Sequence, residues 1–226
     1  MGLKTSVGFS GKPKSDRVEQ PLIDVGNYPA RLVQLIDLGV QPQASYDGKD
    51  KPPVHQIMLT YELCDTFMVD KDGNEMEDKP RWESERMPLY PLASERAKST
   101  ARYNALDPEC VHEGDFAACI NTPVMINFVH NKKGDKTYAN IGGISAMRPR
   151  DVAKCPELKN EPRIFDLEEP TLESFNALPK WIQDIVKGNL NYRGSALESL
   201  LAGNSEKKEE KPQEDVPEKD VDDSWD

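Results

Sequence analysis

Aromatic, basic and amide residues recur at alternate positions in two segments of the chain. Trp82, Arg86 and Tyr90 share one parity within residues 81–90, and a second group does the same within residues 136–144. That second group is Lys136, Tyr138 and Asn140. In an extended strand, side chains two residues apart point to the same side. Rings stack on unpaired bases and cations meet phosphates, so each segment has the side chains that a groove for single-stranded nucleic acid needs.

Three further basic residues extend these two groups. Arg81 precedes Trp82, and Lys132 and Lys133 lie in the turn predicted between the last two strands. A structural role remains open for each candidate. Trp82 could cap the end of a barrel, Tyr90 could pack beside the neighbouring prolines, and the lysines and Tyr138 could simply be exposed. The combination of ring, cation and amide favours binding more than any one residue does.

Five strands and one helix are predicted to position these side chains. Residues 54–63 alternate, with Ile57, Leu59, Tyr61 and Leu63 on one face, as is typical of a half-buried strand. The predicted strands cover residues 30–38, 54–63, 81–90, 124–130 and 136–144, and the helix covers 94–106. Five strands suffice for a small barrel, and the five-stranded Greek-key OB-fold commonly binds oligonucleotides. The sequence therefore predicts a mainly β protein, an OB-type barrel with a helix between its third and fourth strands.

Composition divides the chain into four parts. Residues 1–20 are expected to form a flexible basic arm, residues 21–148 the OB-type single-strand-binding domain, and residues 149–203 a linker with short helices. Residues 204–226 are expected to form a disordered acidic tail. Residues 214–226 hold seven acidic side chains against one lysine and cannot supply a core.

The acidic tail is predicted to behave as a polyanion. A polyanion imitates nucleic acid, so it can compete for the protein's own basic groove and dock in basic pockets of other proteins. A random coil of about 22 residues spans about 25 Å, which is far enough to visit that groove. The tail residues expected to contact partner proteins are Asp220, Asp222, Asp223, Trp225 and Asp226.

Charge and motif content argue against several other classes of protein. The formal net charge of −11 does not fit a protein that coats duplex DNA through bulk positive charge. The four cysteines have no pair at the spacing of a zinc ribbon or redox motif, which predicts free thiols and no metal. There is no Gly-rich phosphate loop and the three histidines are isolated, so we expect no enzymatic activity and no cofactor. No apolar run approaches the ~20 residues of a membrane span, so we expect no membrane association.

Four segments carry distinctive stretches of sequence. They read NYPARL at 27–32, IMLTYEL at 57–63, VHNKKGDKTYANI at 129–141 and ALPKWIQ at 177–183. These segments resemble a group of bacteriophage proteins that bind single-stranded DNA through an OB-type domain, and the resemblance extends over about residues 21–201. It implies a role in phage DNA replication, recombination or repair in the cytoplasm of an infected bacterial host.

The tail is similar to the acidic C-termini of bacterial and phage single-strand binders. That resemblance implies recruitment of phage or host replication and recombination proteins, and competition with DNA. Many of those tails end on phenylalanine, whereas here Trp225 is penultimate and Asp226 is last. Two other functions stay open: an adaptor that holds replication or recombination proteins, and a strand-annealing recombination protein. The helical segment at residues 165–203 could pack on the barrel or join two copies in a homodimer.

Overall fold

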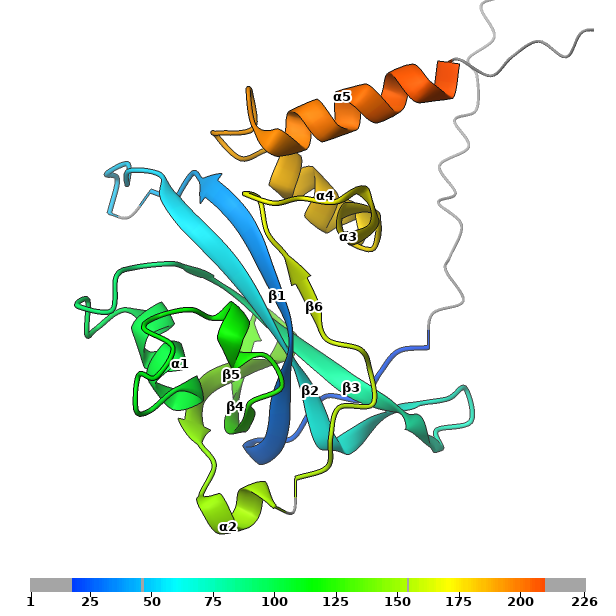
Figure 1. The fold of residues 1–226 in the computed structure, drawn as a ribbon. Helices are drawn as coiled ribbons and strands as arrows, with labels where there is room; N and C mark the ends of the chain where they lie inside the picture. Colours follow the sequence, from blue (N-terminus) through cyan, green and yellow to red (C-terminus); the bar gives the residue numbers. More distant parts are fainter. Residues whose placement is uncertain (1–17, 46, 154, 210–226) are drawn as a thin grey trace, which may run out of the picture. The chain divides into compact units, whose positions relative to one another are not determined.

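Six strands form one antiparallel sheet in the structure, a computed structural model that describes residues 18–45, 47–153 and 155–209 (Figure 1). The strands are β1 (Gly26–Gln41), β2 (Val54–Val69), β3 (Glu75–Pro88), β4 (Pro123–Lys133), β5 (Lys136–Ala146) and β6 (Arg163–Phe165). The first five correspond to the five predicted strands, and the mainly β prediction is confirmed. The sequence did not predict β6, because a strand of three residues is too short to display an alternating pattern.

The helices are short and lie in the connections and the C-terminal part of the chain. They are α1 (Lys98–Leu106), a 3-10 helix η1 (Ala117–Cys119), α2 (Pro149–Val152), α3 (Leu172–Asn176), α4 (Lys180–Lys187) and α5 (Ala196–Glu209). The helix expected from residue 94 begins at Lys98, after turns. The side chain of Ser195 accepts a hydrogen bond from the backbone N–H of Glu198 (3.1 Å) and so caps α5.

The strand order explains where the core lies. Neighbours in the sheet follow the order β3-β2-β1-β4-β5, and β6 also pairs with β1. The order 4-1-2-3 within this path is that of a Greek key, in which the connection from β3 to β4 returns the chain to β1. The predicted inward face of β2 is confirmed, because Ile57, Leu59, Tyr61 and Leu63 all belong to the main core. The strands β1, β4 and β5 add apolar side chains to the same cluster.

Helix α1 contacts strands from both ends of the strand order. It packs against β3 at one end and against β4 and β5 at the other, and Figure 1 shows it against the latter pair. The sheet must therefore curve for its two end strands to reach one helix. Tyr103 and Leu106 of α1 are buried in the core, and the Tyr103 ring meets Phe116 edge-on with centroids 5.2 Å apart. The path itself ends at β3 and β5, so the sheet is open rather than closed.

A buried ionic cluster attaches α1 to the sheet. Glu85 of β3 accepts two hydrogen bonds from Arg102 of α1, at 2.7 and 3.0 Å. Lys98 lies 2.7 Å from the same carboxylate, and the hydroxyl of Tyr61 donates to it at 3.2 Å. The side chains of Glu85 and Arg102 are each only 6% exposed. Burial, followed by the nearby Glu85 charge, raises the pKa of Tyr61 well above its ordinary value, so this hydroxyl stays a donor.

Contacts divide the chain into two compact units. Of the described residues, the first unit contains those up to Ile36 and those within Gln56–Ile164, and the second contains those within Asp37–His55 and those from Phe165 to the end of α5. The boundary expected after residue 148 therefore lies inside the first unit. The second unit has its own small core, which contains Phe165, Phe175, Leu178, Ile182, Val186 and Leu197.

Candidate nucleic-acid interface

The hairpin of β4 and β5 presents one exposed, polar face. The turn consists of two residues, Gly134 and Asp135, because Lys133 pairs directly with Lys136. Gly134 has a φ of +61°, which suits a two-residue hairpin turn. The sequence predicted a longer turn that included Lys132 and Lys133. The structure corrects this: both lysines belong to β4.

Register and alternation decide which side chains share the exposed face. Tyr138 lies opposite Asn131, and Asn140 lies opposite Val129. Toward the hairpin tip, two residues beyond Asn131, Lys133 lies opposite Lys136 on the same side. The opposite side of the hairpin continues into the core through Phe128, Ile126, Ile141 and Ile144. The outer side defines the β4–β5 outer face: Asn127, Val129, Asn131, Lys133, Lys136, Tyr138, Asn140, Gly142 and Gly143.

The predicted residues of this hairpin are accessible. Tyr138 is 46% exposed, and Lys132, Lys133, Lys136 and Asn140 are all exposed. Lys132 pairs with Thr137, so it projects from the other side of the hairpin tip. The structure thus brings Tyr138, Lys133, Lys136 and Asn140 together but sets Lys132 apart. Asp135 in the turn is the acidic residue of this tip.

Sequence reasoning missed Asn131 and the glycine pair on this face. Asn131 sits directly across from Tyr138 and is exposed. Its parity is opposite to that of the core residue Phe128, so the alternation along this strand could have found it. The pairing shifts between Asn127 and Phe128, and this bulge places Gly142 and Gly143 beside Asn127.

The two glycines leave β5 without side chains at the end of the outer face that lies away from the hairpin tip. A Cβ atom added at Gly143 would meet nothing within 4 Å, whereas one at Gly142 would lie 3.0 Å from a methyl group of Val129. A strand glycine often marks a place where a ligand or another backbone approaches closely. Backbone is therefore accessible between Tyr138 and the far end of β5.

The outer face leads to a cleft of about 720 Å3. Its lining includes Pro29, Met125 and Ser145, which are neighbours across β1, β4 and β5. Asp65 and Asp151 also line it, and the guanidinium of Arg148 donates to Asp151 at 2.6 Å. Two carboxylates against one guanidinium make this cleft unfavourable for phosphate, so we do not extend the nucleic-acid interface into it.

Trp82 and Arg86 of the other predicted group, with the neighbouring Arg81, lie on β3, at the opposite end of the strand order from β5. The indole N–H of Trp82 donates to Glu62 at 3.0 Å, and the guanidinium of Arg163 lies 5.9 Å from the centre of its ring. Glu62 is itself buried at 4% exposure. Trp82 is half-buried, and both its N–H and one side of its ring are occupied by other residues of the chain.

The two arginines of β3 also contact other protein groups. Arg81 donates to Glu83 at 2.9 Å and to the backbone carbonyl of Pro21 at 2.5 Å. Arg86 donates to the side-chain carbonyl of Gln56 at 2.5 Å and is otherwise exposed. Of this pair, Arg86 is the one open to a ligand.

Tyr90 does not share a strand face with Trp82 and Arg86. The predicted strand continued to residue 90, but β3 ends at Pro88 because proline has no backbone N–H to extend the ladder. Tyr90 is 40% exposed, and its backbone N–H donates to the Ser99 hydroxyl.

The tail residues Asp220, Asp222, Asp223, Trp225 and Asp226 lie outside the described residues.

Neither a metal centre nor a membrane span emerges within the described ranges. No group of three or more His, Cys, Asp and Glu residues among them could hold a metal ion. No helix among them is long and apolar enough to cross a bilayer.

No protein-family model, curated protein or solved structure matches the chain.

The second unit contains a separate small cavity, of about 250 Å3, beside His55 and Asp37. The imidazole Nε2 of His55 lies 2.6 Å from a carboxylate oxygen of Asp37. This hydrogen bond is the main cause of a raised His55 pKa. Burial opposes the rise, and the charges of Asp37, Glu168 and Asp166 reinforce it.

We expect the stability of the protein to fall as pH rises above 6.5, because the pKa of His55 is raised from that value in the folded state. A histidine whose folded pKa lies above its unfolded value of 6.5 stabilises the fold fully below that pH. The stabilisation is lost as pH rises through the folded pKa. Urea unfolding between pH 5 and pH 9 measures this, and His55→Gln should flatten the upper part of the profile. An unchanged profile in the variant would assign the pH dependence to other groups.

Proposed function

We propose that this chain is a single-stranded DNA-binding protein that holds the strand on the β4–β5 outer face. Tyr138 stacks on a base, Lys133 and Lys136 contact phosphates, and Asn131 and Asn140 offer hydrogen bonds to base edges or sugars. The observation that carries the proposal is a half-exposed ring with two exposed lysines on the same face of one hairpin. Ring stacking and phosphate contacts together are the usual means of holding a single strand.

The dimensions of the face suit a short stretch of single strand. From Asn127 to Lys133, β4 advances about 20 Å at roughly 3.4 Å per residue. A face of this length holds only a few nucleotides of single strand. One OB-type domain occupies about 4–16 nucleotides, so the face suits the lower part of that range. The bare backbone at Gly142 and Gly143 lets the strand lie close to the sheet.

The fold that we propose for the first unit is a partly open OB-type barrel. Three features support it: the Greek-key order of β4-β1-β2-β3, the hairpin that adds β5, and a helix between the third and fourth strands. Helix α1 contacts both end strands, as a helix beneath a nearly closed barrel would. The loop between the fourth and fifth strands is one of those that OB domains use for oligonucleotides, and here it is the tip beside Tyr138.

The β3 group has a conditional role in this proposal. Arg86 is exposed and can contact a phosphate. Arg81 and Trp82 can contribute only if their contacts to Glu83, Glu62 and Arg163 open. We therefore assign the main stacking contact to Tyr138 rather than to Trp82.

The proposed setting is phage DNA replication, recombination or repair in the bacterial cytoplasm. The support for this setting is the sequence resemblance together with the strongly acidic C-terminal residues. Those residues are proposed to recruit phage or host replication proteins and to compete with DNA. The proposed activity is holding a strand, which makes and breaks no bonds and needs no cofactor.

Binding to oligo-dT is expected to weaken steeply with salt, because each phosphate contact releases counterions. The double variant Lys133→Gln/Lys136→Gln should reduce the slope of log affinity against log salt by about 1.4, at roughly 0.7 per contact on a single strand. Fluorescence anisotropy over a salt series gives this slope. The exposed turn residue Lys71 provides the matched control, and Lys71→Gln should leave the slope unchanged. Equal affinity for duplex and single strand, or a slope unaltered by the double variant, would contradict the proposal.

Removing residues 210–226 is expected to tighten oligo-dT binding at low salt. The segment holds eight acidic and two basic side chains and lies beyond α5, so its removal takes away a net charge of −6 and leaves α5 in place. A second variant replaces Asp220, Asp222, Asp223 and Asp226 by asparagine at constant length, which separates charge from chain length. Affinity that is unchanged in both variants would remove competition by the tail from the proposal.

A further inference from the structure

Two cysteines far apart in the sequence meet beside the cleft. Cys64 lies on β2, and Cys155 follows α2, with 91 residues of sequence separation. Their Sγ atoms are 2.9 Å apart and both thiols are free. Both residues line the cleft of about 720 Å3, so a small solute can approach them. No third His, Cys, Asp or Glu among the described residues joins them to form a metal site.

The segment that carries Cys155 is already held in place by β1. We call residues 155–163 the strap. Arg31 is 6% exposed, and its guanidinium donates to the backbone carbonyls of Cys155 (3.1 Å) and Pro156 (2.7 Å). It also donates to the carboxylate of Glu157 at 3.1 Å. The backbone from Cys155 to Glu157 is therefore held against β1.

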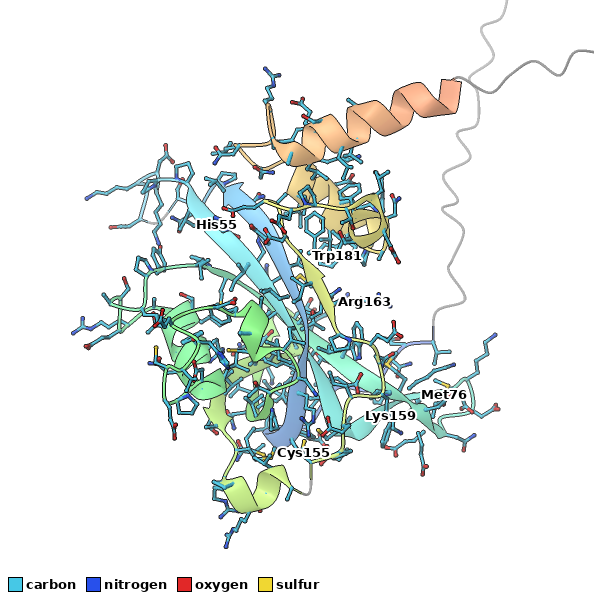
Figure 2. All side chains as sticks on the ribbon, in the orientation of Figure 1. His55, Met76, Cys155, Lys159, Arg163 and Trp181 are labelled. Atoms are coloured by element: carbon cyan, nitrogen blue, oxygen red, sulfur yellow. The ribbon has the colours of Figure 1, made fainter. Side chains whose placement is uncertain are left out.

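The middle of the strap is held by β2 and its neighbours. The buried carboxylate of Glu62 accepts from the backbone N–H of Lys159 at 2.7 Å and from the side chain of Asn160 at 2.6 Å. The Lys159 ammonium lies 4.9 Å from the centre of the Phe67 ring and donates to the carbonyl of Glu77. Figure 2 shows Cys155, Lys159 and Arg163 in sequence along this segment. Noncovalent contacts thus hold Cys155 against Cys64 before any bond forms.

We propose that Cys64 and Cys155 are a redox-responsive pair that closes to a disulfide and fastens the strap to β2. The sulfur atoms must approach by roughly 0.9 Å, from 2.9 Å to the bond length of about 2.0 Å. Side-chain rotation supplies such a shift more readily than backbone movement does. The strap contacts from Arg31 and Glu62 keep the two thiols together, which favours ring closure over reaction with a second molecule.

The oxidant is a low-molecular-weight disulfide that enters through the cleft. The Cys64 thiolate, which is the less buried of the two, attacks one sulfur of that disulfide and releases one thiol. Cys155 then loses its proton and attacks the Cys64 sulfur of the mixed disulfide, which releases the second thiol. Two protein thiols are oxidised, one small disulfide is reduced to two thiols, and the protons balance.

The environment of the pair sets the rate of closure. Burial, followed by the hydrogen bond with Cys155, raises the pKa of the Cys64 thiol well above its ordinary value. Since the thiolate is the attacking species, closure is slow near neutral pH and faster at alkaline pH. Once formed, the bond closes a long loop and disfavours the unfolded chain, so the urea midpoint of the oxidised protein rises.

Glutathione disulfide is the probe for the test, applied to the full chain at neutral and alkaline pH. After proteolysis without reduction, mass spectrometry should find one peptide pair joined through Cys64 and Cys155, and the intact protein should lose two hydrogens per closed pair. The exposed Cys110 serves as an internal reference, since it should take a mixed disulfide under the same conditions. In Cys64→Ser, the joined peptides should disappear while Cys110 still reacts.

Two results would overturn the proposal. One is stable mixed disulfide at Cys64 or Cys155 without the joined peptides, and the other is no reaction at either residue while Cys110 reacts fully. The urea midpoint of the oxidised protein, measured in a Cys110→Ser background to prevent intermolecular products, is a second readout. A midpoint no higher than that of the reduced protein would also count against closure. These measurements involve no nucleic acid, so they stand independently of the proposed function.

Discussion

Replacing Glu85 by glutamine is expected to destabilise the protein by about 3–5 kcal/mol, because one partner of a buried ion pair is lost. The substitution keeps the shape of the side chain but leaves the Arg102 guanidinium, 6% exposed, without its counter-charge. The hydroxyl of Tyr61 and the ammonium of Lys98 lose an ionised partner at the same time. The free energy of unfolding from urea titration measures the effect.

Two comparisons separate loss of a buried charge from a general effect of mutation. Asp184→Asn breaks an exposed i,i+4 pair with Lys180 on α4 and should cost only about 0.3–0.5 kcal/mol. The double variant Glu85→Leu/Arg102→Met removes both buried charges and should be considerably less damaging than Glu85→Gln alone. If Glu85→Gln costs no more than Asp184→Asn, the cluster does not hold α1 to the sheet.

Replacing Tyr138 by alanine is expected to weaken oligo-dT binding by about 1–3 kcal/mol, or roughly 5- to 150-fold, if its ring stacks on a base. Tyr138 is 46% exposed, so the fold should be little affected. Trp181 on α4, at 57% exposure, offers a matched control, because it is an exposed aromatic residue outside the β4–β5 outer face. Trp181→Ala should leave binding unchanged. Equal small effects from both variants would mean that the strand does not stack on Tyr138.

Gly143 offers a complementary test of the same face, by addition rather than removal of atoms. There is open space around a Cβ atom at this position, and its φ is not in the left-handed region, so a side chain can be added. Gly143→Leu should weaken oligo-dT binding by obstructing the strand, whereas Gly143→Ala should have little effect. Urea unfolding of both variants confirms that the fold is retained. Full binding by Gly143→Leu would place the strand elsewhere.

The alternation of residues along β2 and β5 was sufficient to predict which side chains share a face. Ile57, Leu59 and Tyr61 point into the core as predicted. Tyr138 and Asn140 point to the outside together, also as predicted. This succeeded because the two-residue period of a strand is a local property of the backbone, independent of what packs against the sheet. The mainly β class and the position of the helix between the third and fourth strands follow from the same local patterns.

Whether the Trp82 side chain is free to bind a ligand depends on residues that strand alternation does not connect with it. Its N–H contacts Glu62 across the β2–β3 ladder, and its ring lies beside Arg163, which follows some 80 residues later. The sequence of residues 155–163 shows no regular period, so nothing local predicts that this segment returns to the sheet. Pro88 likewise ended β3 before Tyr90, although the apolar pattern continued.

By itself, the sequence determined that this chain is mainly β and that Tyr138, Lys136 and Asn140 share one strand face, since these are consequences of local periodicity. The tertiary structure alone decided that Lys133 and Asn131 join that face while Lys132 does not, because the register of a hairpin depends on the length of its turn. It also decided that Cys64 meets Cys155 and that Glu85 pairs with Arg102. Such pairings join distant parts of the chain, and they arise only when burial of the whole core brings those parts together.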